Sequence, residues 1–304
     1  MRCVVTGASG FLGGHVARAL IDRGLEVAVI MRGSKIPNRL NNCAGKLRVI
    51  HGDLQLPESY QQAFIAFQPE AVLHLAWTGV AGSARNDITQ ASNITASLAL
   101  VELAAKHGVR HFINAGSQAE YGQLDKRISE SDPTHPTTLY GHSKLAVGAM
   151  LQLLCAEHDM RFAHLRVFST YGPDNQMHWL IPYLITELMQ GRSPKLTLCE
   201  QKWDFLYVTD AANAFVEVLL NESAAGIFNL GSGSAPPLRE TVETIHALVN
   251  PAIKLAYGEV PYRPDQIMHL EADVTRLKNT TRWQPAVTLK QGLEMTVKWY
   301  AKQY

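Results

Sequence analysis

Tyr140 and Lys144 are the residues whose types and spacing suggest chemistry most directly. They open a long stretch with helical patterning, and a separation of four places the phenol and the ammonium on one helix face, one turn apart. A free tyrosine has a pKa of about 10, and a neighbouring cation favours its ionised form. Such a pair can move a proton to or from a hydroxyl or carbonyl while a hydride is transferred. Taken alone, this spacing is a frequent chance match between surface side chains on a helix.

Ser117 adds a third group to this pair. It follows a predicted strand over residues 111–115, and open α/β folds bind their ligands at the carboxyl edge of the sheet, where such a strand ends. A serine hydroxyl at that edge can hydrogen-bond the same substrate oxygen that the tyrosine serves. We therefore predict that Ser117, Tyr140 and Lys144 are the catalytic residues.

A glycine-rich turn, Thr6-Gly7-Ala8-Ser9-Gly10-Phe11-Leu12-Gly13, joins a predicted strand over 2–6 to a predicted helix over 13–23. Glycines let a pyrophosphate approach the main chain, and the helix N-terminus offers it free N–H groups. Tight strand-to-helix turns also use glycine for structural reasons alone. The strand before and the helix after favour a dinucleotide site. We expect the cofactor to contact Gly7, Ser9, Gly10, Phe11, Leu12 and Gly13.

The segment after the second predicted strand, over 26–31, indicates which dinucleotide binds. An acidic residue there would bond the adenosine ribose 2′-hydroxyl, but the chain has Met31-Arg32-Gly33-Ser34-Lys35. Arg32 can bind a 2′-phosphate and stack on adenine, which predicts NADP(H); the alternative is a solvated loop arginine. Asp53, with Leu54, follows a third predicted strand over 47–51. Asp53 can accept from the adenine amino group or serve only as a turn residue.

The composition of the 304 residues limits the classes of protein that fit. Hydrophobic residues make up 46% and charged residues 18%, which is typical of globular proteins. The net charge of +1 disfavours a nucleic-acid binder, and a mean hydropathy of −0.06 without long apolar runs disfavours a membrane span. The scattered cysteines, without a CxxC motif, predict buried thiols in a reducing, cytoplasmic compartment and no metal site.

Short apolar runs alternate with longer helical stretches through the first half of the chain. This alternation predicts an α/β fold: a Rossmann-type doubly wound parallel sheet with helices on both faces. Further strands are predicted over 71–76 and 162–168, and further helices over 59–67, 93–107 and 140–158. Prolines become frequent after Gly172 and the elements become shorter. We expect a dinucleotide-binding domain over 1–168, to which 205–230 returns, and a smaller interleaved C-terminal substrate lobe over 169–204 and 231–304.

Several motifs together resemble the extended short-chain dehydrogenase/reductases that act on nucleotide-diphosphate sugars, along nearly the whole chain. The motifs are TGASGFLG at Thr6–Gly13, GDL at Gly52–Leu54, HLAW at His74–Trp77, AGSQAEYG at Ala115–Gly122, YGHSK at Tyr140–Lys144, RVFSTYGP at Arg166–Pro173, DFLYVTD at Asp204–Asp210, FNLGSG at Phe228–Gly233, and a tail from Arg263-Pro264-Asp265 through Asp273 to Arg282-Trp283-Gln284-Pro285. Together they are specific for the family and less specific for one reaction.

The resemblance implies roles for individual residues. It implies Tyr140 as acid/base, Lys144 on the nicotinamide ribose and Ser117 on the sugar oxygen. It also implies cofactor contacts at Leu75, Ala76 and Val167, and substrate contacts at Trp77, Thr78, Gln118, Ser169, Trp179 and Arg263, the last as a pyrophosphate clamp. Trp179 and Tyr207 could stack on the nucleotide base. Simple packing is the alternative for Trp77, Trp179 and Tyr207, and a surface ion pair is the alternative for Arg263. The family further implies a homodimer through the helices over 93–107 and 140–158, which could instead only cover the sheet.

Departures from the family pattern narrow the predicted reaction. Gln118 and Ala119 stand where sugar 4,6-dehydratases have Asp-Glu, which excludes that reaction. UDP-galactose-type 4-epimerases usually have an acid near Arg32, whereas GDP-4-keto-6-deoxymannose reductases share the arginine and resemble this chain better. We predict NADPH-dependent reduction of the C4 keto group of a nucleotide-diphospho-4-keto-6-deoxyhexose. The family commonly has Asn at the position of Ser169 and Arg at the position of Trp203. Because of these two departures, the identities of the sugar and of the nucleotide base remain open.

Two other functions remain open. An NAD-dependent nucleotide-sugar 4-epimerase would hold its cofactor through dialysis and show no net oxidation. A catalytically silent NADP(H)-binding regulator would need no proton donor, so the presence of Ser117, Tyr140 and Lys144 counts against it. The expected partners are a nucleotide-diphospho-sugar and a second copy of the chain, with no nucleic acid and no membrane.

Overall fold

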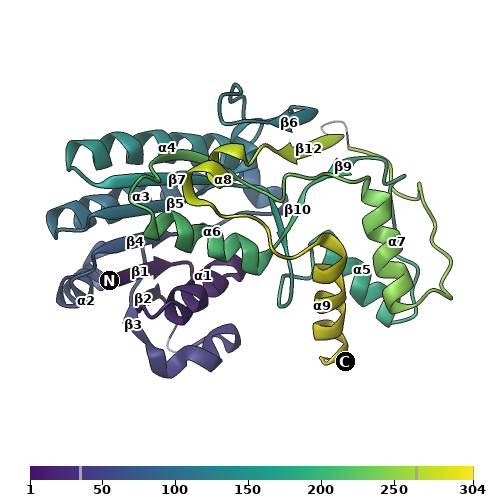
Figure 1. The fold of residues 1–304 in the computed structure, drawn as a ribbon, viewed down its shortest axis with the longest axis horizontal. Coiled ribbons are helices and arrows are strands. Elements are labelled where there is room, and N and C mark those ends of the chain that lie inside the picture. Colours follow the sequence, from purple (N-terminus) through teal and green to yellow (C-terminus); the bar gives the residue numbers. More distant parts are fainter. Residues whose placement is uncertain (34–35, 264–265, 304) are drawn as a thin grey trace.

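A seven-stranded parallel sheet with the order β11-β7-β5-β4-β1-β2-β3 forms the centre of the molecule (Figure 1). The computed structural model describes residues 1–33, 36–263 and 266–303. The strands of this sheet are β1 (Arg2–Thr6), β2 (Glu26–Met31), β3 (Leu47–His51), β4 (Ala71–His74), β5 (His111–Ser117), β7 (Arg161–Val167) and β11 (Gly226–Leu230). The first three agree residue for residue with the predicted strands. β4 ends earlier than predicted, and β5 continues past Ala115, so that Ser117 is its last residue.

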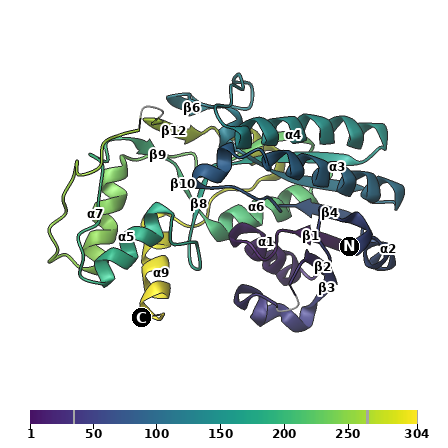
Figure 2. The ribbon, with the colours of Figure 1, turned by 180° about the vertical axis from the view of Figure 1, so that it is seen from behind.

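Helices cover both faces of the sheet, which confirms the predicted doubly wound fold. α3 and α4 pack together on one face, and α1 and α6 on the other (Figures 1 and 2). The helices are α1 (Phe11–Asp22), α2 (Gln61–Phe67), α3 (Gln90–Lys106), α4 (Leu139–Glu157), α5 (Leu180–Met189), α6 (Val208–Leu220), α7 (Leu238–Val249), α8 (Thr275–Thr281) and α9 (Leu289–Ala301). Neighbouring residues of β1 enter different cores: Val5 packs with Val16 of α1, and Val4 with Leu100 of α3. Burial on both faces therefore explains why the strands are apolar throughout.

A second lobe stands at one end of the sheet and carries α5, α7 and α9 (Figures 1 and 2). Two small parallel sheets join it to the rest. One pairs β8 (Ser169–Tyr171) with β10 (Phe205–Tyr207), and the other has the order β6 (Lys126–Ile128), β12 (His269–Ala272) and β9 (Lys202–Trp203). Thus β10 lies outside the main sheet, whereas β11 belongs to it.

Asp204 ties these small sheets to the main one. Its buried carboxyl accepts hydrogen bonds from the backbone and hydroxyl of Ser232 (both 2.7 Å), from the Gly233 N–H (3.0 Å) and from the Ala272 N–H (3.1 Å). Ser232 and Gly233 follow β11, and Ala272 ends β12. One side chain therefore fixes the junction at which the chain passes between the sheets.

The four cysteines, Cys3, Cys43, Cys155 and Cys199, are buried free thiols, which agrees with the predicted burial. Within the described residues, no helix has both the length and the apolar composition needed to cross a bilayer. In the same part of the chain, no group of three or more His, Cys, Asp or Glu side chains is arranged to hold a metal ion.

Candidate active site

Ser117 stands at the carboxyl end of β5, where it caps a short 3₁₀ turn over Gln118–Glu120. Its Oγ accepts a hydrogen bond from the Ala119 N–H (3.1 Å), and its own backbone N–H donates to Oε1 of Glu120 (2.8 Å). Val167, a predicted cofactor contact, pairs with Ser117 on the neighbouring strand. The two hydrogen bonds hold the serine in place while its hydroxyl hydrogen stays available to a third group.

α4 brings Tyr140 and Lys144 to Ser117. The buried Lys144 ammonium donates to the carbonyl of Ala115 (2.7 Å) and lies 3.8 Å from the centroid of the Trp77 ring. Trp77 in turn meets Tyr140 edge to face, with ring centroids 6.1 Å apart. The three predicted catalytic residues and Trp77 therefore form one cluster at the edge of the sheet.

The surroundings of this cluster shift the proton affinities of its members. Burial lowers the pKa of Lys144 to about 7, and the charge of Glu120 opposes that shift. Burial raises the pKa of Tyr140, whereas a hydrogen bond with Ser117 and the nearby guanidinium of Arg85 lower it. The cluster thus offers a phenol beside a hydroxyl and an ammonium that releases its proton near neutral pH, which suits proton exchange with a substrate oxygen.

A buried ionic network beneath Ser117 was missed by sequence reasoning. Glu120 accepts from Nε of Arg166 (2.8 Å) and lies 3.0 Å from Nε2 of His164, whose Nδ1 is 3.0 Å from Asn114. Burial alone would raise the pKa of Glu120, but its neighbours together lower it to about 2. A signal existed, because His164 and Arg166 are alternate residues on one face of a strand that is otherwise apolar from Phe162 onward.

The glycine turn has the close backbone packing expected of a pyrophosphate cradle. A Cβ on Gly7 would stand 2.6 Å from the Ala76 nitrogen, and one on Gly13 would stand 2.2 Å from the Gly7 oxygen. Gly10 caps α1 without any side-chain hydrogen bond, so the N–H groups of the first turn remain for an anion. The predicted contacts Leu75 and Ala76 thus abut Gly7, and these residues fit a dinucleotide.

Comparison with known proteins places this geometry in a family. The profile of the "NAD dependent epimerase/dehydratase family" matches residues 3–231. The chain belongs to that family. The UDP-glucose 4-epimerase of Bacillus subtilis is 27% identical over an alignment of 330 positions. The alignment covers 97% of this chain and 94% of that protein.

Solved structures of two 4-epimerases superpose on the whole chain. The UDP-glucose 4-epimerase of Thermus thermophilus, in complex with NAD, is 25% identical, has a TM-score of 0.89 and is covered over 100% of both chains. The UDP-N-acetylglucosamine 4-epimerase of Methanobrevibacter ruminantium, in complex with UDP-N-acetylmuramic acid, is 27% identical with a TM-score of 0.90, covering 100% of this chain and 99% of that one. These likenesses support the predicted family and fold, but they do not specifically support a resemblance to GDP-4-keto-6-deoxymannose reductases.

The glycine turn of this epimerase/dehydratase family member yields a direct prediction. We expect Gly13→Ala to weaken dinucleotide binding by about tenfold or more, because the added methyl must displace the Gly7 carbonyl at a cost of about 1–3 kcal/mol. Calorimetric titration with NAD and NADP measures the effect. Gly45→Ala is the matched control, since its Cβ would meet nothing within 4 Å. Equal affinities in both variants would contradict the assigned cradle.

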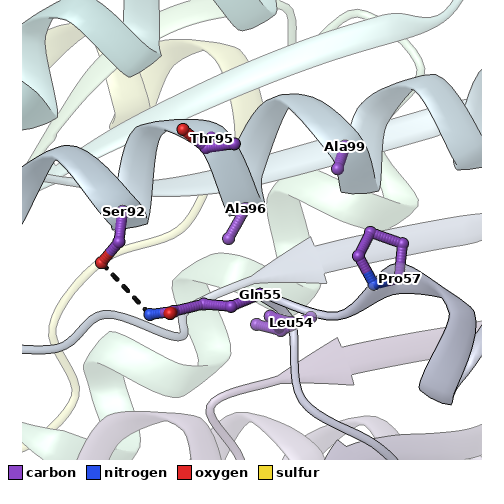
Figure 3. Close-up of a pocket in the computed structure, with 7 residues that line it drawn as sticks. All are labelled: Leu54, Gln55, Pro57, Ser92, Thr95, Ala96 and Ala99. Carbon is purple, nitrogen blue, oxygen red and sulfur yellow. Dashed lines mark hydrogen bonds between the residues drawn. The ribbon is translucent and has the colours of Figure 1, made fainter.

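The predicted adenosine contacts lie at the ends of β2 and β3. Nη1 of Arg32 is 4.0 Å from Oδ2 of Asp53, and the Arg32 side chain is 75% exposed. Asp53 also accepts from the Gln55 N–H (3.0 Å), as a turn residue does, and its contact with the adenine amino group stays a prediction. Leu54 and Gln55 line a pocket of about 240 Å³ against α3, where Gln55 bonds Ser92 (Figure 3). Ser34 and Lys35 lie outside the described residues.

The predicted substrate contacts divide into two groups. Thr78 joins the cluster through its neighbour Trp77 and is fixed by two hydrogen bonds with Asn93 (2.9 and 3.0 Å). The Gln118 Oε1 is buried without a hydrogen-bond partner among the described residues, so it can accept from a ligand. Ser169 accepts from the Trp203 indole (2.7 Å), which shows that the two departures from the family pattern contact each other.

The other group consists of Trp179, Tyr207 and Arg263. Trp179 precedes α5, with its ring against His178 and 42% of its surface exposed. Tyr207 is buried against the ring of Tyr171, so it packs in the hydrophobic core, which was the alternative to stacking on a base. Arg263 is exposed and borders Pro264 and Asp265, which lie outside the described residues. The assignment of Trp179 and Arg263 to the substrate remains a prediction.

Proposed function

We propose that this chain is a nucleotide-sugar 4-epimerase that works with a bound nicotinamide dinucleotide. The proposal is carried by the cluster of Ser117, Tyr140 and Lys144 beside a glycine turn that suits a pyrophosphate. The 4-epimerases among its relatives favour epimerisation over net reduction. The lobe over 169–204 and 231–304 would hold the nucleotide-sugar, and α3 and α4 would pair in a homodimer.

The chemistry requires a proton to leave the C4 hydroxyl and a hydride to leave C4, and both must later return. A bound nicotinamide supplies an acceptor that takes a hydride and gives it back. Ser117 Oγ and the Tyr140 phenol hold the C4 oxygen, and ionised Tyr140 takes its proton as the C4–H bond breaks and the carbonyl forms. After the keto sugar presents its other face, Tyr140 returns the proton to this oxygen as the C4–H bond re-forms. The sugar is inverted at C4 and nothing is oxidised overall.

Two further side chains complete this proposed site. Lys144 lies one helix turn from Tyr140, favours the ionised phenol and would bond the nicotinamide ribose. Gln118 would use its unpartnered buried oxygen to accept from a sugar hydroxyl, because an unpaired buried acceptor costs about 1–3 kcal/mol until it is satisfied.

A second candidate is an NADPH-dependent reductase of a nucleotide-diphospho-4-keto-6-deoxyhexose. The observation in its favour is Arg32, which replaces the acid expected after β2 of an NAD enzyme. Its guanidinium is exposed beside Asp53, where it could bind a 2′-phosphate. In that reaction Tyr140, assisted by the same Ser117 and Lys144, would protonate the C4 oxygen once and would not take the proton back.

One experiment separates these functions. The purified protein is dialysed and its nucleotide extracted and identified. It is then incubated with UDP-glucose, UDP-N-acetylglucosamine and UDP-glucuronic acid, and C4 epimers are sought by chromatography. In parallel, consumption of NADPH and NADH is followed with dTDP-, GDP-, UDP- and CDP-4-keto-6-deoxyhexoses.

We expect retained NAD(H) and interconverted C4 epimers. Net consumption of NADPH with a keto sugar and no epimer would replace the epimerase by the reductase and assign Arg32 to the 2′-phosphate. A bound dinucleotide without turnover of any sugar would favour the silent regulator instead.

A further inference from the structure

Arg85 contacts the face of the proposed proton-transfer residue. It lies on a 3₁₀ turn over Gly82–Asn86, between β4 and α3, and its guanidinium carbon is 5.0 Å from the centroid of the Tyr140 ring. Its Nε is buried and has no hydrogen-bond partner among the described residues. The family motifs do not include Arg85, and the steps proposed above do not use it.

The position of Arg85 is fixed by its neighbours on both sides. The carbonyl of Ala84 accepts from the Gln90 amide (2.9 Å) at the start of α3. The Asn86 side chain accepts from the Leu139 N–H (3.0 Å), directly before Tyr140. The turn therefore holds the guanidinium over the ring even though its Nε makes no hydrogen bond.

Four groups with charge or exchangeable protons face Tyr140. Ser117 bonds it, Lys144 lies one helix turn away, Glu120 is buried below and Arg85 covers its face. Burial lowers the pKa of Lys144 to about 7, so part of its charge is lost at neutral pH. The Lys144 ammonium is also bonded to the Ala115 carbonyl. Because an arginine stays charged in proteins, Arg85 is the cation at Tyr140 that does not change with pH.

We infer that Arg85 is a positioning residue whose fixed charge holds the Tyr140 ring in place and stabilises its ionised form. The inference rests on the proposed function in one respect, namely that Tyr140 is the group that exchanges the proton. A cation on an aromatic face contributes more when it is desolvated, as the buried Nε is. The attraction strengthens when the phenol ionises, because opposite charges then face each other.

The test measures the ionisation of Tyr140 without substrate. Tyrosinate absorbance is titrated with pH in wild type, Arg85→Met and Arg85→Lys, each against the same protein with Tyr140→Phe, so that the difference reports Tyr140 alone. We expect the midpoint to lie at higher pH in Arg85→Met and to return toward wild type in Arg85→Lys. Arg48→Met is the matched control, because it removes a guanidinium 6.0 Å from the Phe67 ring.

Kinetics supply a second readout. In Arg85→Met we expect kcat to fall about tenfold at neutral pH and to recover at alkaline pH, with KM unchanged. An unchanged Tyr140 midpoint in Arg85→Met would overturn the inference. A raised KM with an unchanged pH profile would also overturn it and assign Arg85 to substrate binding. If no sugar is turned over, the proposed function fails, but the titration still decides the role of Arg85.

Discussion

Tyr140→Phe is expected to lower kcat by about 10²–10⁴-fold while the protein stays folded and still binds dinucleotide. The substitution removes only the hydroxyl that exchanges the proton, and it keeps the ring between Trp77 and Arg85. Turnover of whichever sugar the epimer assay identifies, thermal unfolding and dinucleotide titration measure the three properties separately.

Tyr60→Phe provides the matched control for this loss. It also deletes one phenol hydroxyl, but that hydroxyl is buried without a partner among the described residues, so its removal should leave activity unchanged and stability equal or higher. Full turnover by Tyr140→Phe would refute the proton-transfer role, whereas equal losses in both variants would indicate a general packing effect.

Glu120→Gln is expected to destabilise the protein by about 3–5 kcal/mol, because it leaves the buried Arg166 without its counter-charge and disturbs the contact with His164. Urea unfolding at pH 7 measures the loss. Glu102→Gln is the control: Glu102 pairs with Lys106 one helix turn away on the surface (3.8 Å), and such a pair contributes at most about 1 kcal/mol. A loss from Glu120→Gln no larger than the control would show that the network contributes nothing to stability.

The same variant should change how stability depends on pH. The pKa of Glu120 in the folded protein is about 2, below its ordinary value of 4.5. The contribution of its charge to the free energy of unfolding is therefore complete at pH values above 4.5 and disappears as the pH falls toward 2. The difference in unfolding free energy between wild type and Glu120→Gln should shrink across that window. A difference that stays constant would contradict the assigned ionisation.

Local patterns were sufficient for the parts of the site that depend on neighbours in sequence. The Tyr140–Lys144 spacing, the glycine turn and the strand that ends at Ser117 each depend on a few adjacent residues, and the structure has all three at the sheet edge. Glu120 and His164 are 44 residues apart, and their contact depends on how β5 and β7 align. No local pattern could predict that pairing.

Arg85 and the reaction itself were beyond sequence reasoning for different reasons. The path of the segment around Arg85 is set by the Gln90 side chain, whose amide reaches the carbonyls of Gly79 and Ala84, and such contacts leave no periodic trace. Reduction and epimerisation use the same Ser117, Tyr140 and Lys144. Arg32, the segment over 116–122 and the tail over 263–285 favoured reduction by their resemblance to the reductases, whereas the relatives favour epimerisation.

The Asp204 junction has a consequence for how a nucleotide-sugar enters. Separating the ends of β11 and β12 from Asp204 would strip several donors from a buried carboxyl, each at a cost of about 1–3 kcal/mol. These segments are therefore expected to stay together when a nucleotide-sugar enters. Structures with and without substrate should both keep the hydrogen bonds from Ser232, Gly233 and Ala272 to Asp204.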